Sequence, residues 1–335
     1  MKKTFKFIGI ITFVLLIGFS LTACDTSDEG DGGGGGGGNS GIICTAISST
    51  ASTFGSSNNI RAITWGASAG RFVAGGTNGR MAYSSNGTTW TAIDPANSKF
   101  DGSAVNNITW GNNKFVAVGD AGKMAYSTDG ITWIAVTNST FTSSNINAIA
   151  WGNNKFLAVG DNGKIAHSTD GITWTAVADS TFTGYNISGV AWGNNRFVAV
   201  TEGSRIVYSG DGGITWTIAT HSIITSWETI TFANNKFIAG GTFSDMAYSS
   251  DNGSTWTAIS DSKIHQTVRG IAWGNNKFVA VGNYTSISYS LNGIEWTAIK
   301  DNTFLSHQHV RSVAWGSNKF VFVGDEGRMA YWSGN

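Results

Sequence analysis

The hydrophobic positions of residues 146–177 fall into four short runs that are rich in β-branched and aromatic side chains. These runs span residues 147–151, 155–160, 164–168 and 172–177. The polar stretches between them read Gly-Asn-Asn, Asp-Asn-Gly and Thr-Asp-Gly, which favour tight turns because Asn, Asp and Gly tolerate positive φ angles. Short apolar runs that alternate with such turns predict four antiparallel β-strands.

The same pattern of runs and turns recurs seven times along the chain. Each copy carries an aromatic marker at the end of its first run, at spacings of 40 to 45 residues: Trp65, Trp110, Trp151, Trp192, Phe232, Trp273 and Trp315. A period near 41 residues with four strands per repeat is typical of a β-propeller blade. We therefore predict an all-β fold, a closed seven-bladed β-propeller with four antiparallel strands per blade.

The two ends of the repeat array complement each other. The seventh copy stops where its fourth strand is due, while residues 43–47 align with the fourth strand of the other copies. Cys44 occupies the position where the other copies carry Trp, so we expect it to be a small buried apolar residue. We predict that this N-terminal strand completes the last blade and closes the ring.

The turn between the third and fourth strands resembles a known motif. Ser209 to Trp216 and Ser249 to Trp256 resemble the Asp-box, or BNR repeat, and shorter or Asn-containing versions occur in other copies. Asp-boxes occur in sialidases, in other glycoside hydrolases and in the seven-bladed photosystem II assembly factor. The resemblance covers residues 41–335 and implies a propeller, but it does not imply one function. We expect the Asp and Ser of these turns to hydrogen-bond the turn backbone and the Trp to pack between sheets.

The N-terminus indicates export. Three Lys residues precede an apolar run from Phe7 to Phe19, which has the shape of a secretory signal peptide spanning residues 1–23. The run ends in Leu21-Thr22-Ala23-Cys24, which resembles the bacterial lipobox, whose Cys becomes lipid-modified. Residues 24–40 are acidic and Gly-rich, so we expect a flexible tether. The expected domains are thus signal peptide, lipidated Cys24 with its tether, and a propeller over residues 41–335, anchored to a bacterial membrane through lipid.

Charge and composition narrow the range of partners. When Lys2, Lys3, Lys6 and the acidic residues of the tether are set aside, 18 basic and 17 acidic side chains remain, so nucleic-acid binding is not expected. The sequence carries no Gly-rich phosphate loop before a helix, no nucleophile elbow and no metal-ligand spacing. We therefore expect no cofactor and no metal, and we expect a monomer.

Candidate functional residues are those at which one blade carries a different residue type from the other blades at the same position of the repeat. In a four-stranded meander, the loops before the first strand and between the second and third strands share one face, which we call the mouth. Four residues before each marker aromatic the copies carry Arg61, Asn106, Asn147, Ser188, Glu228, Arg269 and Arg311. The three Arg belong to neighbouring blades in a closed ring, and guanidinium groups suit carboxylate or phosphate. Trp227 and Tyr284, with His265, His307 and His309, also lie at the mouth.

Several interpretations of the mouth remain open. The first is noncatalytic binding of an anionic glycan, a peptide or a protein partner by Arg61, Trp227, Glu228, Arg269, Tyr284 and Arg311. The second is an exo-glycosidase similar to sialidases, although the chain lacks the Arg-Ile-Pro motif of that family, whose propellers have six blades. The third is an assembly factor for a membrane complex. The mouth carboxylates Asp120, Asp161, Glu202 and Asp325 would offset the Arg charges, and a solvated channel lining would also explain these residues.

Overall fold

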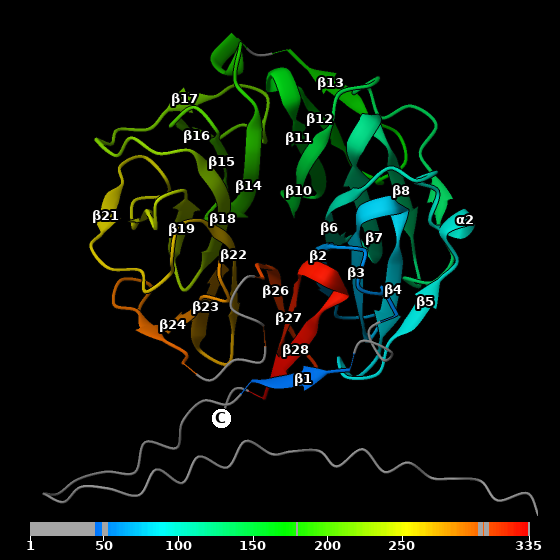
Figure 1. The fold of residues 1–335 in the computed structure, drawn as a ribbon. Coiled ribbons are helices and arrows are strands. Elements are labelled where there is room, and N and C mark those ends of the chain that lie inside the picture. The colour runs from blue at the N-terminus through cyan, green and yellow to red at the C-terminus, as the bar shows by residue number, and fades with distance from the viewer. Residues whose placement is uncertain (1–43, 49–52, 179, 301–303, 305–307, 334–335) are drawn as a thin grey trace, which may run out of the picture. The chain divides into compact units, whose positions relative to one another are not determined.

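The computed structural model describes residues 44–48, 53–178, 180–300, 304 and 308–333. The expected signal peptide (1–23), the tether (24–40) with Cys24, and His307 lie outside these residues. Within the described chain, seven four-stranded sheets are arranged around a common axis, as Figure 1 shows. The predicted seven-bladed propeller is therefore confirmed.

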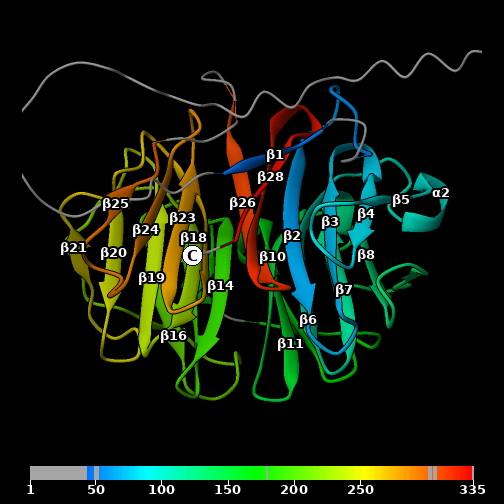
Figure 2. The same cartoon turned by 90° about the horizontal axis from the view of Figure 1, so that it is seen from below.

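Each blade begins with an innermost strand, and we number the blades one to seven in that order: β2 (Ile60–Gly66), β6 (Val105–Gly111), β10 (Ile146–Gly152), β14 (Ile187–Gly193), β18 (Trp227–Ala233), β22 (Val268–Gly274) and β26 (Val310–Gly316). The second strands are β3 (Arg71–Gly76), β7 (Lys114–Gly119), β11 (Lys155–Gly160), β15 (Arg196–Thr201), β19 (Lys236–Gly241), β23 (Lys277–Gly282) and β27 (Lys319–Gly324). The side view in Figure 2 shows these inner strands running along the axis of the ring.

The third strands are β4 (Met81–Ser84), β8 (Met124–Ser127), β12 (Ile165–Ser168), β16 (Ile206–Ser209), β20 (Met246–Ser249), β24 (Ile287–Ser290) and β28 (Met329–Trp332). The outermost strands are β5 (Thr91–Ile93), β9 (Ile134–Ala135), β13 (Thr175–Val177), β17 (Thr217–Ile218), β21 (Thr257–Ile259), β25 (Thr297–Ala298) and β1 (Thr45–Ile47). Short helical turns complete the described chain: α2 (Pro95–Ser98), η1 (Thr77–Gly79), η2 (Asp120–Gly122), η3 (Asp161–Gly163), η4 (Ser180–Phe182) and η5 (Asp325–Gly327).

The hairpins between first and second strands follow from their Asn pairs. In blade two Gly111 lies opposite Lys114, which leaves a two-residue turn of Asn112 (φ 47°) and Asn113 (φ 55°). Two consecutive residues with positive φ match the twist of paired strands, and Asn adopts this conformation readily. Gly111 also permits close packing between blades, because a Cβ there would lie 2.2 Å from the indole of Trp151.

The turn between third and fourth strands has the expected scaffold role. In blade three the Asp170 carboxylate accepts hydrogen bonds of 2.8 Å from the backbone N–H groups of Ile172 and Thr173, and the N–H of Gly171 donates to Ser168 Oγ. These bonds correct one predicted boundary: the fourth strand begins at Thr175, and not at Ile172, because the N–H groups of residues 172 and 173 are held by the turn.

The ring closes as predicted. Thr45, Ala46 and Ile47 of β1 pair with Tyr331, Ala330 and Met329 of β28, so the two ends of the chain share one sheet. Ile47 belongs to the apolar cluster between blades seven and one. Cys44 is buried in the cluster between blades six and seven, as its position in the repeat predicts.

The described core consists of seven clusters, one between each pair of neighbouring blades. The cluster between blades two and three is typical: Val116 and Val118 of β7 meet Phe156 of β11, and Trp174 of the following turn closes it. Each blade is therefore stabilised by packing against its two neighbours. The innermost strands of the seven blades surround the axis of the ring.

Candidate functional site

The seven residues that distinguish the blades all lie at a break in strand pairing. Between the first and third residues of every innermost strand the register with the second strand shifts, so the second residue is the extra residue of a β-bulge: Arg61, Asn106, Asn147, Ser188, Glu228, Arg269 and Arg311. A bulge changes the direction of a side chain relative to a regular strand. It explains how the side chains of the bulge residues reach the axis of the ring.

These residues line a channel at the mouth end of the axis. A cavity of about 280 Å³ is lined by all seven bulge residues and by residues that follow them on the innermost strands. Within the same opening, four charged residues line a space of about 220 Å³: Arg61, Glu228, Arg269 and Arg311. The structure therefore brings together four of the six candidate residues, and all four are charged.

Trp227 and Tyr284 occupy other positions. Trp227 is 0% exposed and packs in the apolar cluster between blades four and five, because it is the first residue of β18 and corresponds to Ile60 and Val105 of other blades. It does not reach the channel. Tyr284 is 45% exposed on the loop after β23, where its ring packs edge-on against His309 with centroids 5.5 Å apart. Tyr284 thus lies on the rim.

Arg311 is neutralised within its own blade. Its Nε donates to Asp325 Oδ1 at 2.5 Å, and both side chains are mostly buried. Asp325 begins the turn η5 that follows β27, fourteen residues after Arg311. The same spacing joins Asn106 to Asp120 at 2.8 Å and Asn147 to Asp161 at 2.9 Å. In blades two, three and seven the bulge residue therefore bonds the residue that starts the next mouth turn of its own blade.

Arg269 has no carboxylate at the equivalent position of its own blade. The residue fourteen positions after it is Asn283, whose Oδ1 accepts from Arg269 Nε at 2.5 Å but carries no charge. Burial lowers the pKa of Arg269, and so does the neighbouring Arg311, whereas Glu228 and Asp325 oppose the shift. Arg269 remains a cation at neutral pH, since a guanidinium is not deprotonated in proteins. Its charge is balanced only by carboxylates of other blades.

Arg61 also lacks an acid in its own blade, where Thr77 starts the mouth turn. Its Nη1 donates to Asn106 Oδ1 at 2.7 Å and lies 3.8 Å from Asp120 Oδ2, both in blade two. An ion pair this long and half-exposed is weak. Arg61 is thus held by hydrogen bonding more than by charge.

Glu228 is the only carboxylate among the bulge residues. Burial raises its pKa; Arg269 acts in the opposite direction, and Glu202 raises the pKa further. The side chain therefore retains a proton at higher pH than an ordinary glutamate does. It adds a titratable negative charge to a pocket that otherwise contains three guanidinium groups.

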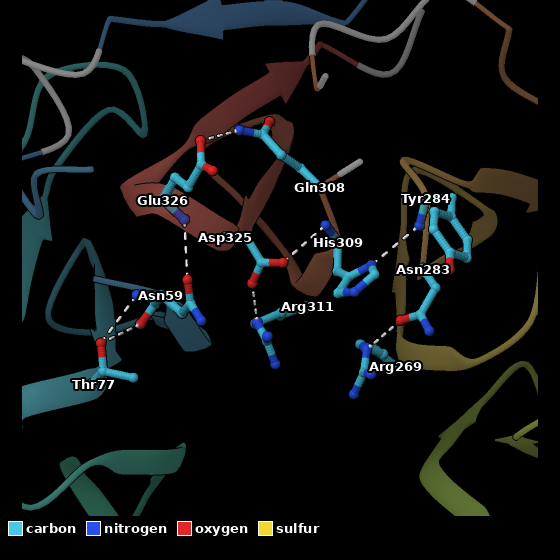
Figure 3. A network of polar contacts seen from close by, with 10 residues as sticks. All are labelled: Asn59, Thr77, Arg269, Asn283, Tyr284, Gln308, His309, Arg311, Asp325 and Glu326. Atoms are coloured by element: carbon cyan, nitrogen blue, oxygen red, sulfur yellow. Dashed lines mark hydrogen bonds and ion pairs between the residues drawn. The ribbon is translucent and has the colours of Figure 1, made fainter. Parts of the chain in front are cut away.

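A chain of hydrogen bonds supports the cationic side of the pocket, as Figure 3 shows. Asp325 Oδ2 accepts from the backbone N–H of His309 at 3.1 Å, and His309 Nδ1 accepts from the N–H of Tyr284 at 3.2 Å. Tyr284 follows Asn283, the partner of Arg269. The two arginines of blades six and seven are therefore linked through their partners, which fixes the distance between them.

Sequence reasoning named Asp325 as a carboxylate that offsets the arginines, but it missed Asn283 and the role of His309. The signal that was available is the fourteen-residue spacing, in blades two, three, six and seven, between a bulge residue and the start of the next mouth turn. No group of three or more His, Cys, Asp or Glu side chains among the described residues is arranged to hold a metal ion. In the same part of the chain, no helix is long and apolar enough to cross a membrane.

Comparisons with known proteins agree with the fold. Residues 134–225 match the family model described as the DUF6242 beta propeller domain. No curated protein matches the sequence.

Solved structures resemble the chain at low sequence identity. YCF48 from Cyanidioschyzon merolae has a TM-score of 0.65 at 17% identity, covering 87% of this chain and 98% of that chain. YCF48 bound to D1 peptide has a TM-score of 0.65 at 16% identity, covering 83% and 92%. The computationally designed Ika8 protein has a TM-score of 0.58 at 14% identity, covering 83% and 97%. What these proteins share with this chain is the propeller fold.

Proposed function

We propose that this protein is a noncatalytic binding propeller that captures an acidic group of a polypeptide partner in its mouth. The observation that carries the proposal is the set Arg61, Arg269 and Arg311, which three neighbouring blades present to one pocket although only Arg311 has a close carboxylate partner. Buried or half-buried guanidinium groups with incomplete charge partners favour a carboxylate or phosphate ligand.

A polypeptide is favoured over a glycan by one comparison. A propeller of similar fold, YCF48, has been solved bound to a peptide from D1. That likeness supports a peptide ligand for a propeller of this architecture. The three arginines of the pocket favour a ligand that carries negative charge. Anionic glycans are the alternative that the same pocket would accept, and an array that presents both classes separates them.

The glycosidase alternative receives less support. A sialidase-type mechanism needs a tyrosine and a carboxylate that act together on the substrate. Here Glu228 lines the pocket, whereas Tyr284 lies on the rim against His309, and it is not among the described residues that line the pocket. We expect no release of fluorophore from a fluorogenic sialoside above that of an Arg269→Ala control; release that depends on Arg269 would contradict the noncatalytic proposal.

We also propose that the propeller is exported and held at a membrane by lipid on Cys24. Leu21-Thr22-Ala23-Cys24 after the apolar run supports this location. An anchored binding protein of this kind is suited to help assemble a membrane complex. Metabolic labelling with an alkyne fatty acid should mark the wild-type chain and leave a Cys24→Ser variant unlabelled; equal labelling of both would refute the anchor.

The binding proposal is tested with variants that carry the same Arg-to-Gln substitution either inside or outside the pocket. Arrayed peptides that differ by a single Glu-to-Gln exchange are probed with the full chain and with the Arg269→Gln, Arg311→Gln and Arg80→Gln variants. Arg80 is an exposed arginine next to the mouth turn η1 of blade one and lies outside the pocket lining, so it is the matched control.

We expect Arg269→Gln to weaken binding to acidic peptides about 10- to 100-fold, because a charge-assisted hydrogen bond contributes about 1.5–3 kcal/mol. Arg80→Gln should change binding less than about twofold, which is the range expected for a rim charge. If the acidic and amide peptides bind equally well, or if Arg80→Gln and Arg269→Gln behave alike, the proposal is wrong.

A further inference from the structure

The mouth edge of blade five carries the two most exposed large hydrophobic side chains of the described chain. Ile224 is 88% exposed and Phe243 is 84% exposed, followed by Leu291 at 63%. Ile224 precedes Thr225 and Phe243 follows Thr242, and the hydroxyl of Thr225 donates to the backbone oxygen of Thr242 at 3.1 Å. Both hydrophobic side chains are therefore attached to one hydrogen-bonded corner.

Phe243 occupies a backbone position that does not suit it. Its φ is 56°, and the next residue, Ser244, has φ 69°. At the corresponding place, Asn78, Ala121, Asn162 and Glu326 of blades one, two, three and seven have φ between 54° and 57° and are each followed by Gly. Tyr284 of blade six has φ 53° and is followed by Thr285. Asn and Gly adopt this region readily, whereas an aromatic residue there is an outlier. The phenyl ring of Phe243 is almost fully exposed, so packing does not offset the backbone strain. Backbone strain of this kind concentrates at functional sites.

A cleft opens beside Phe243. It encloses about 360 Å³ between the mouth loops of blades five and six, and the apolar residues that line it are Phe243, Ile259, Ile264 and Ala298. The other lining residues are polar: Ser244, Asp245, Ser260, Asp261, Ser262, Lys263 and His265. Asp261 and Lys263 form an ion pair with each other. The volume lies at the lower end of the roughly 300–1,000 Å³ that is usual for small-molecule pockets. The cleft is therefore large enough for one large apolar side chain.

One pair of strands joins the corner at Phe243 to the charged pocket. Trp227 at the start of β18 lies opposite Gly241 at the end of β19, and the N–H of Thr242 donates to the backbone oxygen of Ser226. Glu228, which lines the pocket, follows Trp227, while Phe243 follows Thr242. At about 3.3 Å per residue of extended chain, Glu228 and Phe243 are separated by on the order of 10 Å, or about three residues of a ligand.

We infer that Ile224, Phe243 and the cleft beside them form an apolar subsite that takes a large aliphatic or aromatic side chain of a polypeptide ligand, about three residues from its acidic group. The inference rests on the proposed function, whose pocket holds that acidic group. It adds a second recognition element, which selects among acidic partners.

The chemistry of the corner favours a polypeptide side chain over a sugar. The hydroxyl of Thr225 is engaged by Thr242, and the charges of Asp261 and Lys263 satisfy each other. A sugar ring needs polar partners for its hydroxyl groups, while an apolar side chain gains free energy from the exposed Ile and Phe surfaces alone. A second copy of this chain is the remaining occupant, and the experiment includes it as an outcome.

The test is selection of random dodecapeptides on phage with the full chain immobilised. Four proteins are compared: wild type, Ile224→Ser/Phe243→Ser, Arg269→Gln/Arg311→Gln, and Leu291→Ser. Leu291 is the matched control because it is an exposed apolar residue in the turn between β24 and β25, on the face opposite the mouth. Melting curves verify that the variants fold, which their exposure leads us to expect.

Wild type and Leu291→Ser should enrich peptides that carry an acidic residue with a large apolar residue about three positions away. Ile224→Ser/Phe243→Ser should still enrich acidic residues but lose the apolar preference, and it should bind the best wild-type peptide about 10-fold more weakly by fluorescence anisotropy. Arg269→Gln/Arg311→Gln should lose the acidic preference.

Each of the other possible outcomes would contradict either the apolar subsite or the proposed function. Acidic enrichment without apolar preference, identical in wild type and Ile224→Ser/Phe243→Ser, would refute the subsite and leave the proposed function intact. Apolar enrichment without any acidic preference would refute the proposed function and, with it, the spacing inferred here. Binding to a glycan array that depends on Phe243, or a wild-type dimer in sedimentation velocity that Phe243→Ser abolishes, would assign the corner to a sugar or to a second copy instead.

Discussion

At the scale of single residues, the pocket differs from a neutral channel because the partners of the arginines are unequal. Arg311 has Asp325, whereas Arg269 has the uncharged Asn283 and Arg61 reaches only a distant Asp120. Two other bulge residues, Asn106 and Asn147, use their amides to bind the acids of their own blades. A ligand carboxylate should therefore interact most strongly with Arg269, because this guanidinium has no carboxylate partner in its own blade.

Glu228 gives this pocket a dependence on pH. Burial raises its pKa above the ordinary value of 4.5, so as the pH falls from neutrality the side chain becomes neutral before an exposed carboxylate does. Loss of this negative charge beside Arg269 should tighten binding of an acidic peptide as the pH is lowered. Glu228→Gln removes the charge at every pH, so we expect about threefold to tenfold tighter binding at pH 7 and a difference from wild type that shrinks as the pH falls.

Titration calorimetry with one acidic peptide at a series of pH values measures this effect. Glu295→Gln, an exposed residue in the turn between β24 and β25, is the control for a general change in net charge. Weaker binding by Glu228→Gln would show instead that Glu228 contacts the ligand directly.

At the scale of elements, the turn between third and fourth strands is a structural unit whose acid is replaceable. Burial raises the pKa of Asp170, but hydrogen bonds from Thr173, Ile172 and Ser168 outweigh it, and the pKa is lowered. In blade one Asn86 accepts the equivalent bonds from Thr88 and Thr89 at 2.9 Å without a charge. The turn therefore requires a side-chain oxygen that accepts hydrogen bonds from the backbone, and this oxygen does not have to be charged.

We expect Asp170→Ala to lower the free energy of unfolding by about 1–3 kcal/mol, because it leaves two backbone N–H groups without their acceptor. Asp170→Asn should cost less than about 1 kcal/mol, since the chain itself uses Asn at this place. Because the folded pKa of Asp170 lies below its unfolded value near 3.8, its charge stabilises the fold above that pH and the effect is lost as the pH falls further. Urea denaturation at pH 7 and pH 3 measures both; equal losses for the two variants would contradict the acceptor argument.

At the scale of the whole molecule, stability depends on ring closure. The strand β1 covers the edge of β28 and contributes Ile47 to the cluster between blades seven and one, while Cys44 contributes to the cluster between blades six and seven. Without this segment, two of the seven clusters lose a side chain and a strand edge is exposed.

Deleting residues 41–49 should therefore lower the melting temperature by about 10 °C, given about 1.5–3 kcal/mol for each buried apolar side chain and about 2–4 °C per kcal/mol in a domain of this size. Deleting residues 24–40 is the control, because it removes the tether and spares the strand. Differential scanning calorimetry compares the two, and equal melting temperatures would refute the closure of the ring by β1.

The repeat allowed much of this structure to be predicted. The markers from Trp65 to Trp315, the hairpin turns and the missing last strand specify blade number, strand order and closure, because repeats of similar pattern fold alike and stack on one another. The same comparison found Arg61, Glu228, Arg269 and Arg311, which the structure places in one pocket. It also named Trp227, which is buried, because the pattern around a β-bulge does not reveal which of two neighbouring residues turns inward.

The sequence by itself determined the architecture, since a repeating pattern of apolar runs and turns has few ways to bury its strands. Only the tertiary structure decided the chemistry of the mouth. The pairing of Arg311 with Asp325, the uncharged partner of Arg269 and the buried state of Glu228 depend on distances between side chains from different turns and blades. The corner of Ile224 and Phe243 also became visible only there, because exposure and backbone strain are properties of the folded chain.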